Sequence, residues 1–518
     1  MARKRLTPFS KILIVAAIVG AVYFLLMQLR NPDVKDKINE VTSSSSSKGG
    51  KTKEGYKDVI NIGVVTWGGY AGGQYFNQGF DANTNSRFYK DYGFKVKFKV
   101  IDDFDASRDA FKNGDIDLMW ATIDAFPTEV EGLAQYQPQV VFQADWSRGG
   151  DAIVARRGIN KVRDLKGKKI AVAPMTPSHS FLIWLLEAGD IDFKDVTLVQ
   201  VPSAIDAADA FKSGTVDAAV VWSPDDADCV SKVAGARVLE STKNATHIIA
   251  DVFVAKKDFI ENNKQQLRDL YEGWMIGASE LNGSDAKKRE AAKILAEGLS
   301  QPEDFCYDAI NNVRLTTHGD NKDFFGLNPN YNGVTGESLY NDMKVKYNDL
   351  GFSTTGAKSW RLLSTKDLVA KTTSLTGANH EDEGQKQFSE VSEQLIKKES
   401  LSSKKVSISF NTGQFQLTEN AKQLIDIQFT KIAKAFANAR VRIEGNTDNV
   451  GGRSSNIALS KKRAQSVADY LIKEHHMPKN RFIIVGNGPD KPVAGCERNQ
   501  NADCKAKNRR TDFELVVD

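Results

Sequence analysis

Short apolar runs alternate with helical patterns between residues 58 and 227 of this 518-residue chain. The runs at 59–65, 116–126 and 216–222 are short and rich in Val, Ile and Ala. Continuous apolar strands that alternate with helices are typical of a mainly parallel sheet with helices on both faces. The chain is also too long for one hydrophobic core, so we expect several domains.

The carboxyl ends of such strands predict where a ligand binds, because ligands of open α/β sheets lie in the crevice beyond these ends. The residues that we expect to bind a ligand there are Trp67, Gly68, Tyr70, Thr122, Asp124, Trp146, Asp151, Thr176, Ser178, Trp222 and Asp225. The aromatic and acidic members suit a planar heteroaromatic molecule or an organic cation. The helix start at 176–178 suits an anion, and a zwitterion would satisfy both.

Alternative roles stay open for some of these residues. Packing in the core would equally explain Trp222, and helix capping would equally explain Thr176. Trp67 favours a functional role more strongly, because the adjacent Gly68 and Gly69 let backbone approach a ligand.

Three stretches of this region carry a resemblance to a known family. They are "AFKNGDIDLMWAT" at 110–122, "DLKGKKIAVAP" at 164–174 and "AFKSGTVDAAVVWSPDD" at 210–226. Residues 58–371 resemble the periplasmic substrate-binding proteins of ABC importers, especially those for nitrate, sulfonates, taurine and thiamine-precursor pyrimidines. The resemblance implies a two-lobed α/β periplasmic-binding-protein fold whose lobes close on a small solute.

The amino terminus has the pattern of a membrane anchor. Arg3, Lys4, Arg5 and Lys11 precede an apolar run at 12–27, extended by residues 28 and 29. About eighteen residues rise roughly 27 Å as a helix, enough to cross a bilayer core. The basic flank favours a cytoplasmic amino terminus, and no small-residue cleavage site follows. We therefore expect a single transmembrane helix in a bacterial inner membrane, with the remainder of the chain in the periplasm.

Two polar stretches divide the remainder of the chain. "TSSSSSKGGKTKEG" at 42–55 is typical of a flexible spacer, and "TTSLTGANHEDEGQKQ" at 372–387 marks a second break. We therefore expect a cytoplasmic tip and anchor at 1–30, a linker at 31–57, a two-lobed region at 58–375, a linker at 376–402 and a terminal domain at 403–518.

The terminal domain has the pattern of a small α+β fold. Apolar residues at helical spacing between 417 and 436 predict a long helix between two strands, and a second helix and two further strands follow. Asp448 comes directly after a strand, and Arg463 lies two helical turns beyond Asn456. An Asp and an Arg on rigid neighbouring elements can hold the ammonium and carboxylate of an amino acid. A salt bridge between the two is the alternative.

"GNTDNVGGRSSNIALSKKRAQSV" at 445–467, together with "AKNRRTDFELV" at 506–516, resembles the OmpA-like peptidoglycan-binding domain. The resemblance covers about 403–518. It implies that Asp448 and Arg463 hold the diaminopimelate of the wall peptide, and that Thr447 and Asn456 line the same site. Arg509 also matches the motif and is expected to be mainly structural.

Other features exclude several functions. Cys229 and Cys306 lie in no metal-binding spacing, and no catalytic arrangement is visible, so we expect neither an enzyme nor a cofactor or metal. Cys496 and Cys504 could form a disulfide in an oxidising compartment. With 70 basic and 66 acidic residues, the charge is too balanced to indicate a nucleic-acid partner.

The sequence therefore predicts an inner-membrane-anchored periplasmic protein that binds a small solute in its middle region and peptidoglycan through its last domain. A membrane protein complex is a further candidate partner. Two alternatives remain: an ABC-importer component held at the wall, and a purely structural tether between membrane and wall.

Overall fold

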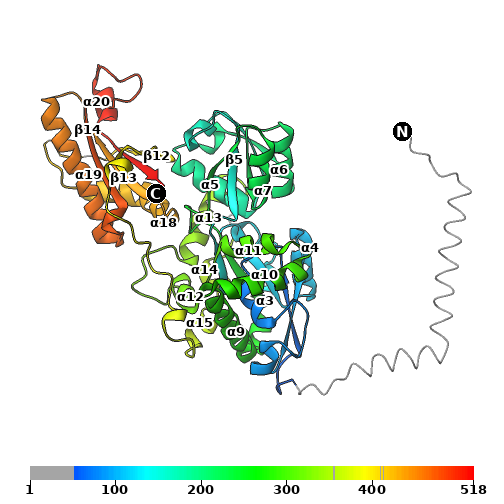
Figure 1. Ribbon diagram of the computed structural model, residues 1–518. Helices are drawn as coiled ribbons and strands as arrows, with labels where there is room; N and C mark the ends of the chain where they lie inside the picture. The colour runs from blue at the N-terminus through cyan, green and yellow to red at the C-terminus, as the bar shows by residue number, and fades with distance from the viewer. Residues whose placement is uncertain (1–51, 354–355, 409, 412, 518) are drawn as a thin grey trace, which may run out of the picture. The chain divides into compact units, whose positions relative to one another are not determined.

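The computed structural model describes residues 52–353, 356–408, 410–411 and 413–517 (Figure 1). The predicted transmembrane helix and most of the first linker lie outside these residues. Among the residues that are described, no helix has both the length and the apolar character needed to cross a membrane. Residues 54–518 form one compact unit.

The first lobe is built on a six-stranded sheet with the order β11-β4-β10-β3-β1-β2. Its strands are β1 (Val59–Val64), β2 (Lys95–Val100), β3 (Leu118–Thr122), β4 (Pro138–Ser147), β10 (Ala250–Lys256) and β11 (Val313–Leu315). Its helices are α3 (Ala71–Asn77), α4 (Phe104–Asn113), α8 (Lys257–Asn262), α9 (Lys264–Asn282), α10 (Asp285–Leu299) and α11 (Glu303–Asn311). Every residue of β3 is buried, as expected for a strand covered on both faces.

The second lobe has a five-stranded sheet with the order β7-β6-β8-β5-β9. Its elements are β5 (Asp151–Ala155), β6 (Lys169–Val172), β7 (Thr197–Gln200), β8 (Ala218–Trp222), β9 (Arg237–Ser241), α5 (Pro177–Ala188), α6 (Ala204–Ser213) and α7 (Asp225–Lys232). Helix α6 shows how local sequence sets these bounds. The Ser203 side chain caps its first turn, Ala207 and Phe211 are buried at helical spacing, and Gly214 ends it at a φ of 89°.

Both sheets are mixed, which corrects the expected mainly parallel arrangement. In the first sheet β1 pairs in parallel with β2 and β3, but β10 runs antiparallel to β3 and β4. In the second sheet β5 runs antiparallel to β8 and β9. The cause is the path of the chain, because β5 and β10 begin where the lobes meet, whereas their neighbours β3, β4, β8 and β9 end there.

The chain passes between the lobes in two segments. Residues 148–150 join β4 to β5, and residues 242–249 join β9 to β10. We call these the first and second crossing segments. A third link comes from α13 (Gly336–Asp349), which contacts the first lobe near 126–128 and whose Tyr347 hydroxyl lies 2.8 Å from the Ser180 hydroxyl of α5. The remaining helices of this region are α12 (His318–Phe324), α14 (Trp360–Leu363) and α15 (Asp367–Lys371).

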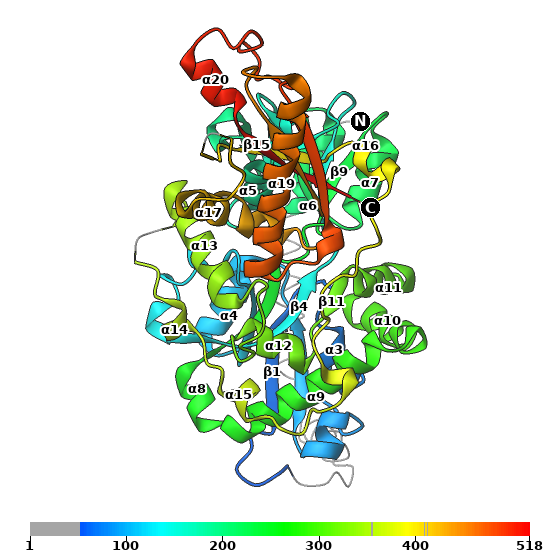
Figure 2. The ribbon, with the colours of Figure 1, turned by 90° about the vertical axis from the view of Figure 1, so that its left-hand side faces the viewer.

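The carboxyl-terminal domain has a four-stranded mixed sheet, as its sequence pattern predicts, with the order β12-β15-β13-β14. Its elements are β12 (Ser402–Val406), α17 (Glu419–Ile425), a π-helical segment (Asp426–Thr430), α18 (Lys431–Ala435), β13 (Arg440–Asn446), α19 (Arg453–His475), β14 (Phe482–Gly488), α20 (Ala502–Asn508) and β15 (Thr511–Val516). Helix α19 packs on β13 and β14, and Figure 2 shows it in front of β15 of the same sheet. A Cβ on Gly445 would lie 2.2 Å from the Ser460 carbonyl oxygen, so glycine permits this close packing.

Candidate functional site

Two aspartates lie side by side where the lobes meet. Asp251 of β10 is the direct cross-strand partner of Asp145 on β4, and it pairs with Thr122 on β3 on its other side. Directly opposite residues of an antiparallel pair present their side chains on the same face. Asp145 is 0% exposed and Asp251 is 4% exposed, so two carboxyl groups adjoin in the interior.

The loop after β1 donates a hydrogen bond to each of these aspartates. The Trp67 indole donates to Asp145 Oδ2 at 3.1 Å, and the Tyr70 hydroxyl donates to Asp251 Oδ2 at 2.5 Å. A Cβ on Gly69 would lie 1.5 Å from Asp145 Oδ2. Glycine at 69 is therefore required for the loop to approach the carboxylate this closely.

Asp151 and Asp124 complete a group of four buried acids, which we call the junction acids. Asp151 begins β5 opposite Trp222 of β8, and its Oδ2 accepts a hydrogen bond from the Ser147 hydroxyl at 2.8 Å. Asp124 follows β3, and its Oδ1 accepts from the Ala250 backbone N–H at 3.4 Å. The junction acids are Asp124, Asp145, Asp151 and Asp251.

Burial dominates the electrostatics of the junction acids. It raises the pKa of Asp124 to about 8 and the pKa of Asp151 to about 7. Burial and the neighbouring carboxylate also raise the pKa of Asp145, and burial raises that of Asp251. Within the described part of the chain, no Lys or Arg forms an ion pair with any of the four. The charges of Arg148 and Arg108 lower the pKa values of Asp145 and Asp251 without pairing with them, and burial outweighs this effect.

The structure brings most of the predicted ligand residues to this place. The Trp67 side chain reaches from the loop after β1 to the first crossing segment, since a Cβ placed on Gly150 would lie 1.9 Å from the Trp67 indole ring. Gly68, Tyr70, Thr122, Asp124, Asp151 and Trp222 lie at strand ends around it. Thr176 occupies the N-cap position of α5, but its hydroxyl donates to the Ala173 carbonyl at 2.8 Å rather than capping the helix. Ser178 is fully buried in the first turn of α5.

Two predicted ligand residues lie elsewhere. Trp146 packs its ring against that of His247, with the ring centroids 4.9 Å apart, and lines a separate cavity of about 570 Å³. Asp225 begins α7 on the second lobe, where its strongest charge interactions are with Lys212 and Asp228. Neither residue belongs with the junction acids.

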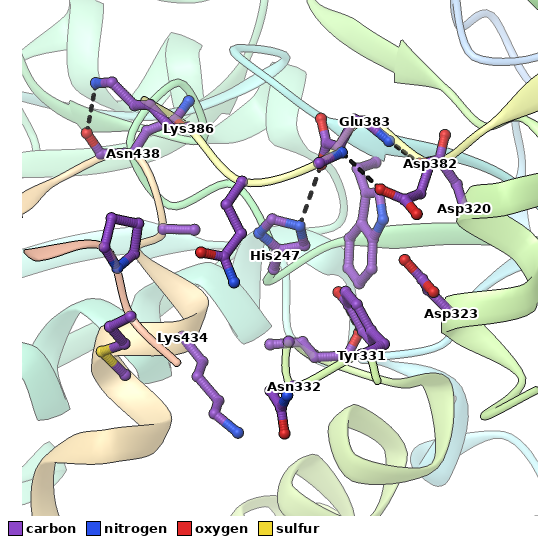
Figure 3. A pocket seen from close by; sticks show the side chains of 18 of the residues that line it. His247, Asp320, Asp323, Tyr331, Asn332, Asp382, Glu383, Lys386, Lys434 and Asn438 are labelled. Atoms are coloured by element: carbon purple, nitrogen blue, oxygen red, sulfur yellow. Dashed lines mark hydrogen bonds and ion pairs between the residues drawn. The ribbon is translucent and has the colours of Figure 1, made fainter. Parts of the chain in front are cut away.

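The separate cavity is lined by the second linker, the two-lobed region and the carboxyl-terminal domain (Figure 3). Glu383 of the linker forms an ion pair with Arg148 of the first crossing segment at 2.5 Å. His247 of the second crossing segment lies 3.3 Å from the same carboxylate. The Glu383 N–H also donates to Asp320 at 2.8 Å. One linker side chain therefore contacts both crossing segments.

The carboxyl-terminal domain contacts the second crossing segment directly. The Asn438 side chain donates to the Lys243 carbonyl at 3.1 Å, and the His247 backbone N–H donates to the Ala435 carbonyl at 3.1 Å. This domain therefore touches the second segment that joins the lobes.

The predicted wall-binding residues gather between β13 and α19. Asp448 Oδ2 forms an ion pair with Arg509 at 2.6 Å, and Asp448 Oδ1 accepts a hydrogen bond from the Val450 N–H at 3.1 Å. Arg463 instead donates to the Gln414 carbonyl at 3.0 Å. Asp448 is thus paired with Arg509 rather than with Arg463, and Arg509, which matches the family motif, lies beside the site as the ion-pair partner of Asp448.

Two further predicted residues hold the loop around Asp448. The Thr447 hydroxyl donates to the Asp448 carbonyl at 2.8 Å, and the Asn456 amide donates to the Val450 carbonyl at 3.0 Å. Burial lowers the pKa of the Arg463 guanidinium, and the charge of Arg509 lowers that pKa further. An anion that bound beside Arg463 would relieve this repulsion.

The cysteines fall into two classes. Cys496 and Cys504 form a disulfide with their Cα atoms 5.0 Å apart, in the loop before β15. Cys229 and Cys306 are free thiols buried in the two-lobed region.

Comparison with known families agrees with both resemblances. Residues 79–296 match the NMT1-like family, and residues 409–509 match the OmpA family. The chain joins an NMT1-like region to an OmpA-family domain. Both expected family resemblances are thereby confirmed.

Individual relatives match separate parts of the chain. The taurine-binding periplasmic protein of Escherichia coli K12 is 28% identical over 191 residues, which cover 36% of this chain and 58% of that protein. The peptidoglycan-associated lipoprotein of Rhizobium meliloti is 35% identical over 103 residues, covering 20% and 56%. Outer membrane protein A of Bordetella avium is 35% identical over 107 residues, covering 21% and 53%. The chain thus spans about half the length of the curated relatives it matches.

Solved structures resemble the two-lobed region. The aliphatic sulphonate binding protein SsuA of Escherichia coli aligns with a TM-score of 0.48 and 17% identity, over 61% of this chain and 100% of that one. The nitrate-binding protein NrtA of Synechocystis PCC 6803 aligns with a TM-score of 0.48 and 13% identity, over 62% and 91%.

Proposed function

We propose that this protein binds a small solute where its two lobes meet and binds peptidoglycan through its carboxyl-terminal domain, in the bacterial periplasm. The junction acids and Trp67 support the first activity, because buried acids without an ion-pair partner are poor structural elements. The OmpA-family match, with Asp448 and Arg463 on neighbouring elements, supports the second. Binding without catalysis is sufficient for both activities.

Solute binding would act through the relative movement of the lobes. Asp145 and Asp251 belong to the first lobe, whereas Asp151 and Trp222 belong to the second. A solute held by both sets stabilises the closed arrangement, and solute entry requires the lobes to part about the two crossing segments. The free-energy difference between open and closed states is then available to a partner such as a membrane protein complex.

Wall binding would use the opposite charges of Asp448 and Arg463. Asp448 suits the ammonium of diaminopimelate, and Arg463 suits its carboxylate. The peptidoglycan-associated lipoprotein named among the relatives supports this assignment, as do the hydrogen bonds of Thr447 and Asn456 that shape the loop. Arg509 would help to position Asp448 through their ion pair.

The periplasmic location rests on several observations. The relatives include a protein named periplasmic and proteins named for the outer membrane, and Cys496 and Cys504 form a disulfide, which persists in oxidising compartments. For the amino terminus, we propose a single inner-membrane span, on the basis of the basic flank and the apolar run at 12–27.

A role as the binding component of an ABC importer is the second candidate. It is favoured by the similarity to the taurine-binding periplasmic protein. In that case the wall-binding domain would restrict diffusion of the protein rather than transmit a signal.

Sedimentation with intact cell walls tests the wall-binding activity. The full chain, in detergent, should co-sediment with diaminopimelate-type peptidoglycan and much less with lysine-type peptidoglycan, because lysine lacks the second carboxylate that Arg463 would hold. Equal sedimentation with both walls would refute the assigned recognition. Failure to sediment with either would refute the wall-binding activity itself.

A further inference from the structure

The junction acids have an unusual arrangement for an interior. Three of them lie on β4, β5 and β10 and the fourth follows β3, and two of them are direct cross-strand partners. Like charges directly opposite each other destabilise a sheet, and a buried carboxylate without a partner costs more. Each of the four acids has one hydrogen-bond donor inside the protein but no ion-pair partner among the described residues, an arrangement more typical of a site for a positively charged ligand than of a structural core.

Several carboxylate oxygens also lack hydrogen-bond partners. Among the described residues none makes a well-formed hydrogen bond to Asp124 Oδ2, Asp145 Oδ1 or Asp151 Oδ1, although all three atoms are buried. The Ser180 and Trp222 side chains lie near enough to lower the pKa values of Asp124 and Asp151, whereas Asp145 Oδ1 has no such neighbour. The nearest cations are engaged elsewhere. Arg108 forms an ion pair with Glu129 at 2.6 Å, and Arg148 forms one with Glu383 at 2.5 Å. Three buried acceptors are thus left for donors from outside the protein.

The geometry favours an organic cation over a metal ion. Within the residues that the structure describes, no group of three or more His, Cys, Asp or Glu is arranged to hold a metal. The acceptors are therefore too dispersed for a single ion, and a ligand with several donors suits them better. The Trp67 indole lies between Asp145 and Gly150 and adds an aromatic wall, which attracts organic cations.

We propose that the solute bound where the lobes meet is an organic cation whose charge is carried on N–H groups, a primary amine or a guanidinium. This inference rests on the proposed solute-binding function and names its ligand class. N–H groups supply the donors that the three acceptors need, and a quaternary ammonium does not. A sulfonate or nitrate would bring negative charge against four carboxyl groups. The preferred class therefore differs in charge from the sulphonate and nitrate named for the similar solved structures.

Calorimetric titration of the full chain tests the ligand class. The probes are 1,4-diaminobutane and agmatine, with tetramethylammonium as a cation without N–H groups and ethanesulfonate as an anion. We expect the first two to bind at least about tenfold more tightly than tetramethylammonium, because their N–H groups donate hydrogen bonds to charged acceptors. Ethanesulfonate should not bind.

Matched variants assign the binding to the junction acids. Asp145→Asn should weaken binding of 1,4-diaminobutane at least tenfold and should raise the melting temperature of the ligand-free protein, because it removes the repulsion by Asp251. Asp109→Asn is the control, since Asp109 is exposed on α4 and pairs only with Lys112 in the described structure. The raised melting temperature would show that the variant folds.

The outcomes separate the ligand class from the wider function. Binding of ethanesulfonate but of neither amine would overturn the cation class and leave solute binding intact. Tetramethylammonium binding as tightly as the amines would overturn the requirement for N–H groups. Unchanged amine binding by Asp145→Asn would overturn the assigned site, and no binding of any probe would count against both the class and the solute function.

Discussion

Glu383 and Arg148 form an ion pair at 2.5 Å that ties the second linker to the first crossing segment of the two-lobed region. The same carboxylate lies 3.3 Å from His247 of the second crossing segment. Both segments must change conformation when the lobes part, and Glu383 restrains both. The linker that leads to the carboxyl-terminal domain is therefore in contact with both segments that join the lobes.

Replacing Glu383 with Gln should destabilise the two-lobed region at neutral pH. Burial raises the pKa of Glu383, but the hydrogen bond from His247 and the charge of Arg148 outweigh it, so the pKa lies well below the ordinary value. The side chain is 25% exposed, so we expect a loss of only about 1 kcal/mol. Urea denaturation followed by tryptophan fluorescence measures this loss, and Glu390→Gln in the exposed linker should have no effect.

The effect of Glu383→Gln should depend on pH with a definite sign. A carboxylate whose pKa is lowered on folding stabilises the protein above its unfolded pKa of about 4.3, and this contribution is lost as pH falls further. The stability difference between the unmodified protein and the variant should be complete at pH 7 and shrink below about pH 4. A difference that grows on acidification would contradict the ion pair.

The junction acids predict the opposite pH dependence. Burial raises the pKa of Asp151 to about 7, so the folded protein binds more protons than the unfolded chain between about pH 4 and pH 7. Ligand-free stability should therefore fall as pH rises through this range, by up to about 1.4 kcal/mol per pH unit for each such group. Melting temperatures measured between pH 5 and pH 8 test this trend. Asp151→Asn should flatten it, and an unchanged slope would show that Asp151 does not titrate as described.

Gly69→Ala should disrupt the loop that reaches the junction acids. The new Cβ would lie 1.5 Å from Asp145 Oδ2, so the loop must move and both the Trp67 and Tyr70 hydrogen bonds are strained. We expect a loss of about 1–3 kcal/mol in unfolding free energy and a loss of solute binding, measured by denaturation and calorimetry. Gly132→Ala is the control, because its Cβ would have no neighbour closer than 3.6 Å. Equal effects of the two variants would contradict the close approach at Gly69.

Local sequence predicted the parts of the site that follow strand ends. Trp67 and Asp124 follow β1 and β3, where the rule that ligands lie beyond the carboxyl ends of strands selects them, whereas Asp151 begins β5. Their contact with a ligand stays a prediction. Asp145 and Asp251 were missed because they lie within strands and meet only through the register of β4 and β10. That register depends on long-range pairing, which local patterns do not contain.

Two other results have similar physical explanations. Trp146 was grouped with the ligand residues although it follows Asp145 directly, and successive strand residues face opposite sides of a sheet. This period-of-two rule accounts for the place of Trp146 in the separate cavity beside His247.

The polar composition of 372–387 predicted a break between domains, but the contact of Glu383 with Arg148, 235 positions away, could not be predicted from composition.

Sedimentation of site variants with diaminopimelate-type peptidoglycan tests most directly the claim that this protein binds peptidoglycan through the opposite charges of Asp448 and Arg463. Asp448→Ala and Arg463→Ala should each reduce the bound fraction by at least about tenfold, since each removes a charged partner of the wall peptide. Asp503→Ala and Lys507→Ala provide matched controls, because these residues form an exposed ion pair at 2.8 Å on α20. We predict that both control variants sediment like the unmodified protein. If Asp448→Ala and Arg463→Ala also sedimented like the unmodified protein, that result would contradict the account.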